Sequence, residues 1–252
     1  MTPGGDGTRL VGGLHSVRAA LKHGPANILE AWVDTHRRDR RLSGLVQELR
    51  RLGIVFNPVD RDTLDRLVPG ANHQGIVVRA KVPVSRDEDA LWHLLDDLQG
   101  PARLLVLDGV QDPHNLGACL RTAEAAAVHA VIAPRDRSVG LTPVVAKVAS
   151  GAVERVPFIQ VTNLARGLRR LADDYRLWIV GTAGEAETDI YEADFSGGVV
   201  LVMGGEGEGL RRLTREHCDQ LLHIPMAGTV ESLNVAVAAG ICLFEIVRQS
   251  RP

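Results

Sequence analysis

Residues 224–245 read IPMAGTVESLNVAVAAGICLFE, and this segment decides the fold of the C-terminal half of the chain. We expect a strand end, a tight loop and then a helix of small residues. Polar side chains stand only where the strand gives way to the helix, at Thr229, Glu231, Ser232 and Asn234. The free N–H donors at a helix start either bind a ligand or are satisfied by an N-cap. Taken alone, the segment fits a core helix capped by Ser232 or Thr229 as well as it fits a binding site.

The composition is that of an ordinary globular protein. The 252 residues, 45% hydrophobic and 24% charged, suffice for one large or two modest domains with a proper core. We find no signal peptide and no apolar run of the roughly 20 residues that a membrane span needs. Cys119, Cys218 and Cys242 are scattered, which predicts free thiols in a reducing compartment. We therefore expect a cytoplasmic protein with no membrane partner, no DNA partner and no metal site.

Charge is distributed unevenly between the two parts of the chain. Residues 1–80 carry 12 Lys and Arg against 8 Asp and Glu, whereas residues 81–252 carry 17 against 23. A basic module joined to an acidic one indicates an anionic partner that docks on the first part. A chance excess of solvated arginines explains the charges alone equally well.

Periodicity predicts a small α/β domain at residues 9–82, a linker with a lead-in helix at 83–101 and a larger α/β domain at 102–252. In the first domain the patterns predict helices at 14–21, 41–52 and 63–67 and strands at 28–33, 54–59 and 75–84. In the second they predict strands at 103–107, 130–133, 156–159, 177–181, 199–203 and 220–224, with helices at 116–127, 144–149, 164–172 and 233–248. Nearly continuous apolar strands predict a buried parallel sheet with right-handed crossovers.

Two further segments share the layout of strand, polar loop and helix. The first, DGVQDPHNLGACLR at residues 108–121, places Asn115 near a helix start, where it is either an N-cap or a site residue. Arg121 is either a surface charge or a phosphate clamp. The second, VVLVMGGEGEGLRRL at residues 199–213, is neither a P-loop nor a dinucleotide fingerprint. Its glycines let the backbone approach a ligand, and we expect Glu206 beside a cation, either Arg121 or a charged cofactor.

Together the three segments resemble the signature motifs of the SpoU (TrmH) branch of the SPOUT RNA 2′-O-ribose methyltransferases. The similarity covers most of residues 102–250, through DPHNLGACLRTAEAAAVHAVI, VTNLARGLRRL, WIVGTAGE, VMGGEGEGLRRLTREHCD and IPMAGTVESLNVAVAAGICLFEIVRQ. GLHSVRAAL and NHQGIVVRA resemble the ribosomal-protein L30e-like domain of members that act on 23S ribosomal RNA. The resemblance implies an α/β trefoil-knot domain with a parallel sheet behind a smaller L30e-like α/β domain.

The resemblance also implies a cofactor, S-adenosylmethionine, and residues for each role. The cofactor would be held by Gly204, Ile224, Met226 and Leu233, with the loop at Gly184 as a weaker candidate for its rim. The catalytic group would comprise Arg121, Asn115, Glu206, Ser232 and Asn234. Arg121 would contact the target phosphate and ribose, Glu206 would orient Arg121, and the other three would place the ribose. Arginine stays protonated, so we expect it to act electrostatically and not as a free base.

Family members are homodimers with catalytic groups from both subunits, which implies a homodimer here. The implied substrate is a guanosine in the peptidyl-transferase P-site loop of 23S ribosomal RNA. Two alternatives keep the chemistry and change the substrate, to transfer RNA or to the ribosomal adenosine whose methylation confers antibiotic resistance. A third alternative is a non-catalytic RNA-binding scaffold.

Overall fold

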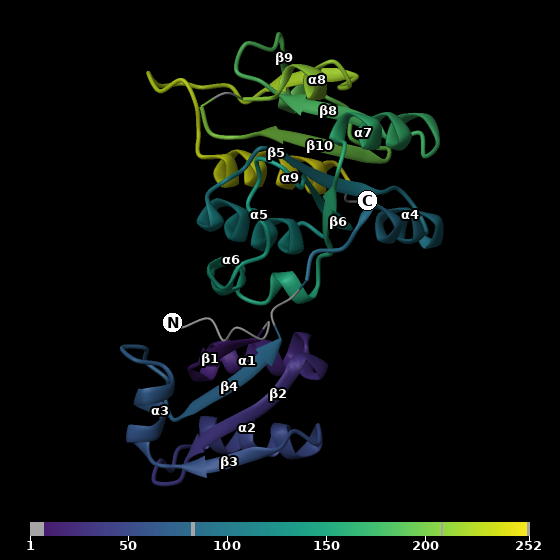
Figure 1. Ribbon diagram of the computed structural model, residues 1–252. Coiled ribbons are helices and arrows are strands. Elements are labelled where there is room, and N and C mark those ends of the chain that lie inside the picture. The colour runs from purple at the N-terminus through teal and green to yellow at the C-terminus, as the bar shows by residue number, and fades with distance from the viewer. Residues whose placement is uncertain (1–7, 82–83, 208, 251–252) are drawn as a thin grey trace. The chain divides into compact units, whose positions relative to one another are not determined.

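The computed structural model describes residues 8–81, 84–207 and 209–250, and the chain forms two compact units that divide between residues 83 and 84 (Figure 1). Residues 82–83, at the end of the strand predicted for 75–84 and at the start of the predicted linker, lie outside the described residues, as do residues 1–7 and 251–252.

The N-terminal unit is a four-stranded sheet in the order β1-β4-β2-β3, in which only β2 and β3 run parallel. Leucines of α1 and α2 pack on one face of this sheet, and Leu64 of α3 packs on the other. The elements are β1 (Thr8–Gly12), α1 (Leu14–His23), η1 (Pro25–Asn27), β2 (Ile28–Asp34), α2 (Arg40–Arg51), β3 (Phe56–Val59), α3 (Arg61–Leu67) and β4 (Ile76–Lys81).

The sequence patterns missed strand β1. Only five residues long, it lies at the edge of the sheet, where Thr8 pairs with Lys81 and Gly12 with Val77. So short a strand shows little periodicity, and its pairing with distant residues of β4 is what defines it.

The second unit contains a seven-stranded sheet in the order β7-β6-β5-β10-β8-β11-β9, and its recorded strand pairs are all parallel, as expected. The strands are β5 (Arg103–Asp108), β6 (Ala130–Pro134), β7 (Phe158–Val161), β8 (Trp178–Thr182), β9 (Thr188–Asp189), β10 (Val199–Gly204) and β11 (Gln220–His223). The helices are α4 (Glu88–Asp97), α5 (Pro113–Ala125), α6 (Pro143–Val148), η2 (Ala152–Glu154), α7 (Leu164–Asp173), η3 (Ile190–Glu192), α8 (Arg212–Arg215) and α9 (Val235–Gln249).

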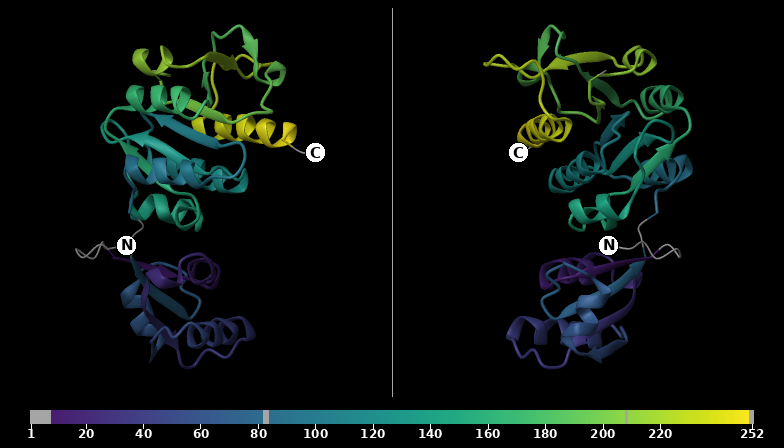
Figure 2. Two further views of the ribbon diagram at one scale, coloured as in Figure 1. Left: turned by 90° about the vertical axis from the view of Figure 1, so that its right-hand side faces the viewer. Right: turned by 60° about the vertical axis from the view of Figure 1, so that its left-hand side comes forward.

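Helices cover both faces of this sheet, which makes three layers (Figures 1 and 2). Leu105 and Leu107 of β5 point to the layer of α5, α6 and α9, and the alternate residues Leu104 and Val106 point to the layer of α4 and α7. This alternation buries both faces and explains why the strands read as continuous apolar runs.

Two predicted boundaries shift for identifiable reasons. Strand β7 begins at Phe158, two residues later than expected, because Pro157 has no N–H to give to a strand ladder. Helix α5 begins at Pro113, three residues earlier than expected, because Pro113 suits a first helical position and Asp112 caps it.

Candidate active site

The three motif loops meet at the carboxyl edge of the sheet of the second unit. Adjacent parallel strands β5, β10, β8 and β11 end there, and α5 and α9 begin there. These helices lie side by side, since a Cβ on Gly240 of α9 would lie 3.6 Å from Cγ2 of Thr122 of α5. The crevice outside the carboxyl ends of parallel strands is where α/β sheets bind ligands.

A chain of hydrogen bonds joins one residue from each motif. Asn115 donates from Nδ2 to Oε1 of Glu206. The Oδ1 atom of Asn115 accepts from Nδ2 of Asn234, at 2.8 Å. These hydrogen bonds bring together residues that are 91 and 119 positions apart in the sequence, as the resemblance implied.

Of the two alternatives left open for these residues, the helix-cap alternative does not hold for Ser232, Thr229 or Asn115. The N-cap of α9 is Asn234, which accepts from the backbone N–H of Ala236 at 2.9 Å, and neither Ser232 nor Thr229 has this role. The N-cap of α5 is Asp112, so Asn115 lies within the first turn and its side chain is free for other contacts. Several polar residues precede each helix, and the backbone turn decides which of them is the cap.

The glycine loop after β10 folds back on itself. Gly205 and Gly209 form an antiparallel bridge. A Cβ on Gly204 would lie 2.5 Å from the backbone nitrogen of Leu210, and one on Gly205 would lie 2.5 Å from the carbonyl oxygen of Gly109. Since real Cβ atoms do not approach so closely, only glycine fits at these two positions.

A buried ion pair holds this loop against the end of β5, and the sequence patterns did not reveal it. The Asp108 side chain is fully buried. Its Oδ1 accepts from Nε of Arg211 at 2.5 Å, and its Oδ2 accepts from the backbone N–H of Arg211 at 3.1 Å. Because β5 and β10 are paired in register at Asp108 and Gly204, the ion pair closes the loop that starts at Gly204.

A cavity of about 620 Å³ opens between the ends of β8, β10 and β11 and the start of α9. All four residues predicted to hold the cofactor line it: Gly204, Ile224, Met226 and Leu233. Three predicted catalytic residues also line it: Glu206, Ser232 and Asn234. The rim candidate Gly184 is present with its neighbours Thr182, Ala183 and Glu185. This volume is in the range of sites for small ligands, and glycine and aliphatic walls suit a molecule held largely by backbone groups.

Two predicted site residues, Asn115 and Arg121, do not line the cavity. Asn115 is hydrogen-bonded to Glu206 and Asn234, which do line it. Arg121 has no such link. It is exposed, and among the described residues it makes no hydrogen bond or ion pair. Six helical positions place Arg121 about 120° around α5 from Asn115. Within one chain Glu206 accepts from Asn115, and its expected pairing with a cation, Arg121 or a charged cofactor, stays a prediction.

The three cysteines are free and unsuited to nucleophilic chemistry. Burial, reinforced by the charge of Glu206, raises the pKa of the Cys119 thiol to about 12. Burial likewise raises the pKa values of Cys218 and Cys242 to about 12. A thiol attacks as its thiolate, so these groups are inert near neutral pH.

Neither a metal cluster nor a membrane helix emerges from the described part of the chain. Its His, Cys, Asp and Glu side chains form no group of three or more that could hold a metal ion. Its helices are too short or too polar to cross a bilayer.

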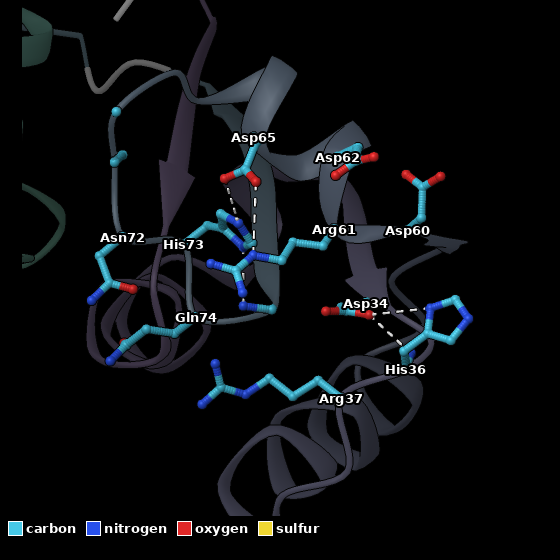
Figure 3. Close-up of a pocket in the computed structure, with 13 residues that line it drawn as sticks. Asp34, His36, Arg37, Asp60, Arg61, Asp62, Asp65, Asn72, His73 and Gln74 are labelled. Carbon is cyan, nitrogen blue, oxygen red and sulfur yellow. Dashed lines mark hydrogen bonds and ion pairs between the residues drawn. The ribbon is translucent and has the colours of Figure 1, made fainter.

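The N-terminal unit has a second cavity of about 970 Å³, lined mainly by polar and charged residues (Figure 3). His73 is buried beside it, accepts the Gly75 N–H on Nδ1 at 3.1 Å and therefore carries its proton on Nε2. That proton is donated to Asp65, at 3.1 Å, and Asp65 also faces Arg61. His73 lies in the NHQG segment and anchors the loop that forms one wall of this cavity.

Comparison with known proteins identifies both units. A model of the SpoU rRNA methylase family matches residues 102–244, and a model described as RNA 2′-O ribose methyltransferase substrate binding matches residues 10–83. The 23S rRNA (guanosine-2′-O-)-methyltransferase RlmB of Haemophilus ducreyi is 56% identical over 237 residues, which span 94% of this chain and 96% of that protein.

Solved structures resemble the whole chain. The AdoMet-bound rRNA methyltransferase from Sinorhizobium meliloti superposes with a TM-score of 0.74 at 25% identity, covering 98% of this chain and 89% of that one. The SpoU methyltransferase AviRb from Streptomyces viridochromogenes, in complex with AdoMet, gives 0.77 at 24% identity, covering 96% and 90%. Because its identity is only 24%, the similarity to AviRb shows the fold alone.

We predict that the Asp108–Arg211 pair stabilises both the fold and the cofactor cavity. Arg211→Met leaves the Asp108 carboxylate buried and uncompensated, so it should lower the free energy of unfolding by about 3–5 kcal/mol. Asp108→Asn should cost less, about 1–3 kcal/mol, because the Arg211 side chain is 34% exposed and can turn to water. Both variants should bind S-adenosylmethionine more weakly, measured by calorimetry.

Arg212→Met is the matched control, because the Arg212 side chain is 77% exposed in its pair with Glu216. It should change stability by less than about 1 kcal/mol and leave cofactor binding intact. Wild-type stability and affinity in Arg211→Met would show that the pair does not hold the loop.

Proposed function

This chain belongs to the SpoU rRNA methylase family, and we propose that it transfers a methyl group from S-adenosylmethionine to the ribose 2′-hydroxyl of a guanosine in 23S ribosomal RNA. One observation carries the proposal: the cavity at Gly204 is lined by the four residues predicted for the cofactor and opens beside the Asn115–Glu206–Asn234 chain. A cofactor site and a set of polar groups suited to a ribose are therefore adjacent.

The cofactor proposal rests on fit to the cavity. Gly204 and Gly205 leave no room for side chains, so backbone groups of the loop line the cavity. Ile224, Met226 and Leu233 supply apolar walls. When bound, S-adenosylmethionine supplies an activated methyl group. The similar rRNA methyltransferase from Sinorhizobium meliloti was solved with AdoMet bound.

The residues of the site act chiefly by positioning the ribose. The reaction forms a bond between the 2′-oxygen and the methyl carbon, breaks the sulfur–carbon bond and releases the 2′-proton. Asn115 and Asn234 fix each other and Glu206, and with Ser232 they are placed to orient the hydroxyl. Orientation of this kind can contribute about 7–11 kcal/mol to lowering a barrier. The proton leaves to phosphate or water.

The N-terminal unit is the proposed RNA-binding domain, with an L30e-like fold, at residues 9–82, followed by the linker at 83–101 and the catalytic domain at 102–252. Its match to a substrate-binding model and its basic charge support this role. The residues that line its cavity include hydrogen-bond donors and acceptors and side chains of both charges (Figure 3). Phosphate contacts would make RNA binding sensitive to salt.

The substrate proposal follows the relatives that match nearly the whole chain. Several proteins named 23S rRNA (guanosine-2′-O-)-methyltransferase are 53–56% identical to it. We favour this substrate over transfer RNA and over the adenosine of antibiotic resistance for that reason. The finer assignment, to a guanosine of the peptidyl-transferase P-site loop, rests on the family resemblance. A cytoplasmic location follows from a ribosomal RNA substrate.

We also propose the trefoil knot and the homodimer that the family resemblance implies. The chain runs from β8 to the far edge at β9, returns to β10 beside β5, and later brings α9 against α5, β10 and η3. This path is compatible with threading. For the dimer, Val237 and Phe244 on α9 are 52% and 48% exposed, two turns apart on one apolar face.

We predict that the N-cap of α9 also serves the reaction. Asn234→Ala should lower kcat about 100-fold, because the ribose loses its placement, in assays of methyl transfer to an unmodified 23S ribosomal RNA transcript. Asn163→Ala is the matched control, since Asn163 caps α7 by the same kind of bond and does not line the cavity. Both should lose about 1 kcal/mol of stability.

An equal loss of activity in the two cap variants would contradict the assignment of Asn234.

A transcript with deoxyguanosine at the target position should accept no methyl group. Transfer to that transcript would refute 2′-O-methylation.

We predict that Arg121 completes the site of the partner subunit, because it is exposed and outside the cavity of its own chain. Arg121→Ala and Glu206→Ala should each be inactive as homodimers. Random exchange makes half of the dimers mixed, and each mixed dimer holds one intact site, so the mixture should recover about one quarter of wild-type activity. An inactive mixture that has exchanged subunits would place Arg121 in its own chain's site.

A further inference from the structure

The loop at residues 135–142, between β6 and α6, lies next to the candidate active site. Strand β6 is the neighbour of β5. The backbone N–H of Val139 donates to the carbonyl of Val110 at 3.0 Å, so this loop lies along the loop that leads into α5 and Asn115. Neighbouring strands are about 4.8 Å apart. The loop is therefore within reach of RNA that flanks a nucleotide in the site.

Two arginines of this loop differ in charge from most of the carboxyl edge, which is acidic. Acidic side chains dominate the carboxyl-edge loops, at Asp112, Asp136, Glu185, Glu187, Glu206 and Glu231. In the described part of these loops, arginine occurs at positions 135, 137 and 211. Arg211 forms an ion pair with Asp108. The side chains of Arg135 and Arg137 are exposed and have no acidic partner among the described residues. An RNA strand approaching this acidic edge needs such charges.

The backbone at Arg137 has an unusual conformation. Arg137 has a φ of 59°, in the left-handed region that glycine occupies without strain. Arginine gains no local hydrogen bond there, among the described residues, to offset the strain. Gln74, Ala127, Ser150 and Arg176 also have a positive φ, so this conformation does not by itself mark a functional position and serves here to choose a matched control.

We propose that Arg135 and Arg137 bind phosphates of the RNA strand that flanks the target nucleotide. The guanidinium fork suits phosphate oxygens, and the contacts would hold the strand in register with the cavity. These arginines are positioning residues for the substrate and touch no reacting atom. The proposal rests on the proposed RNA methyltransferase function and adds a second contact region, on the catalytic unit, for the same substrate.

The chain supplies a closely matched control in Arg176. Arg176 is also an exposed arginine with a left-handed backbone, at φ 55°. It precedes β8 and so lies at the amino edge of the same sheet, opposite the cavity. Replacing either arginine by glycine removes one charge and the same kind of strain. The melting temperature should therefore not fall in Arg137→Gly or in Arg176→Gly.

The experiment measures methyl transfer from labelled S-adenosylmethionine to an unmodified 23S ribosomal RNA transcript, at several salt concentrations, with the full-length protein. Arg135→Gln and Arg137→Gly should each raise KM for the RNA about three- to tenfold and leave KM for S-adenosylmethionine unchanged. Each should also reduce the slope of log KM for the RNA against log salt by about 0.7–0.9. Arg176→Gly should match the wild type in all three quantities.

Wild-type KM and salt slope in both Arg135→Gln and Arg137→Gly would overturn the proposal. An equal effect of Arg176→Gly would also overturn it, because the effect would then follow from net charge or strain. Failure of the wild-type protein to methylate the transcript would refute the proposed function, and this inference with it.

Discussion

The buried carboxylate of Asp108 is the constraint on which the site depends. It is the last residue of β5, it is paired in register with Gly204 of β10, and it accepts both from the side chain and from the backbone of Arg211. The glycine loop between Gly204 and Arg211 is thereby closed onto the neighbouring strand, where only residues without Cβ fit. A cavity shaped by backbone groups needs such a fixed loop, because its glycines have no side chains that could anchor them.

The second requirement is that two helices start at the same edge. Helices α5 and α9 lie side by side, and their first turns meet through the hydrogen bond between Asn115 and Asn234. Asn234 uses one atom of its amide to cap α9 and the other to hold Asn115. The same side chain therefore caps the start of α9 and organises the polar wall of the cavity, which joins the stability of α9 to the geometry of the site.

Much of this arrangement could be predicted from sequence, and the failures have physical causes. Apolar strands such as VVLVM and the three polar loops predicted the parallel sheet and its functional edge, and the motif residues Gly204, Ile224, Met226 and Leu233 do line one cavity. The Asp108–Arg211 pair was missed because its members are 103 positions apart and each reads as an ordinary surface charge. Sequence could not say from which subunit Arg121 comes to the site, and helical phase turns it away from Asn115 of its own chain. Sequence could not single out the helix caps, because Asp112 and Asn234 compete with nearby polar residues and tertiary context chooses among them.

The proposed division into a cofactor cavity, a polar wall for the ribose and a basic N-terminal unit accounts for methyl transfer to RNA. Its most direct test is a map of 2′-O-methylation on ribosomal and transfer RNA from cells with and without the gene for this chain. The account predicts that one guanosine of 23S ribosomal RNA loses its methyl group in the absence of the gene and regains it when the gene is restored. An unchanged map of 23S ribosomal RNA, or a loss confined to transfer RNA, would contradict it.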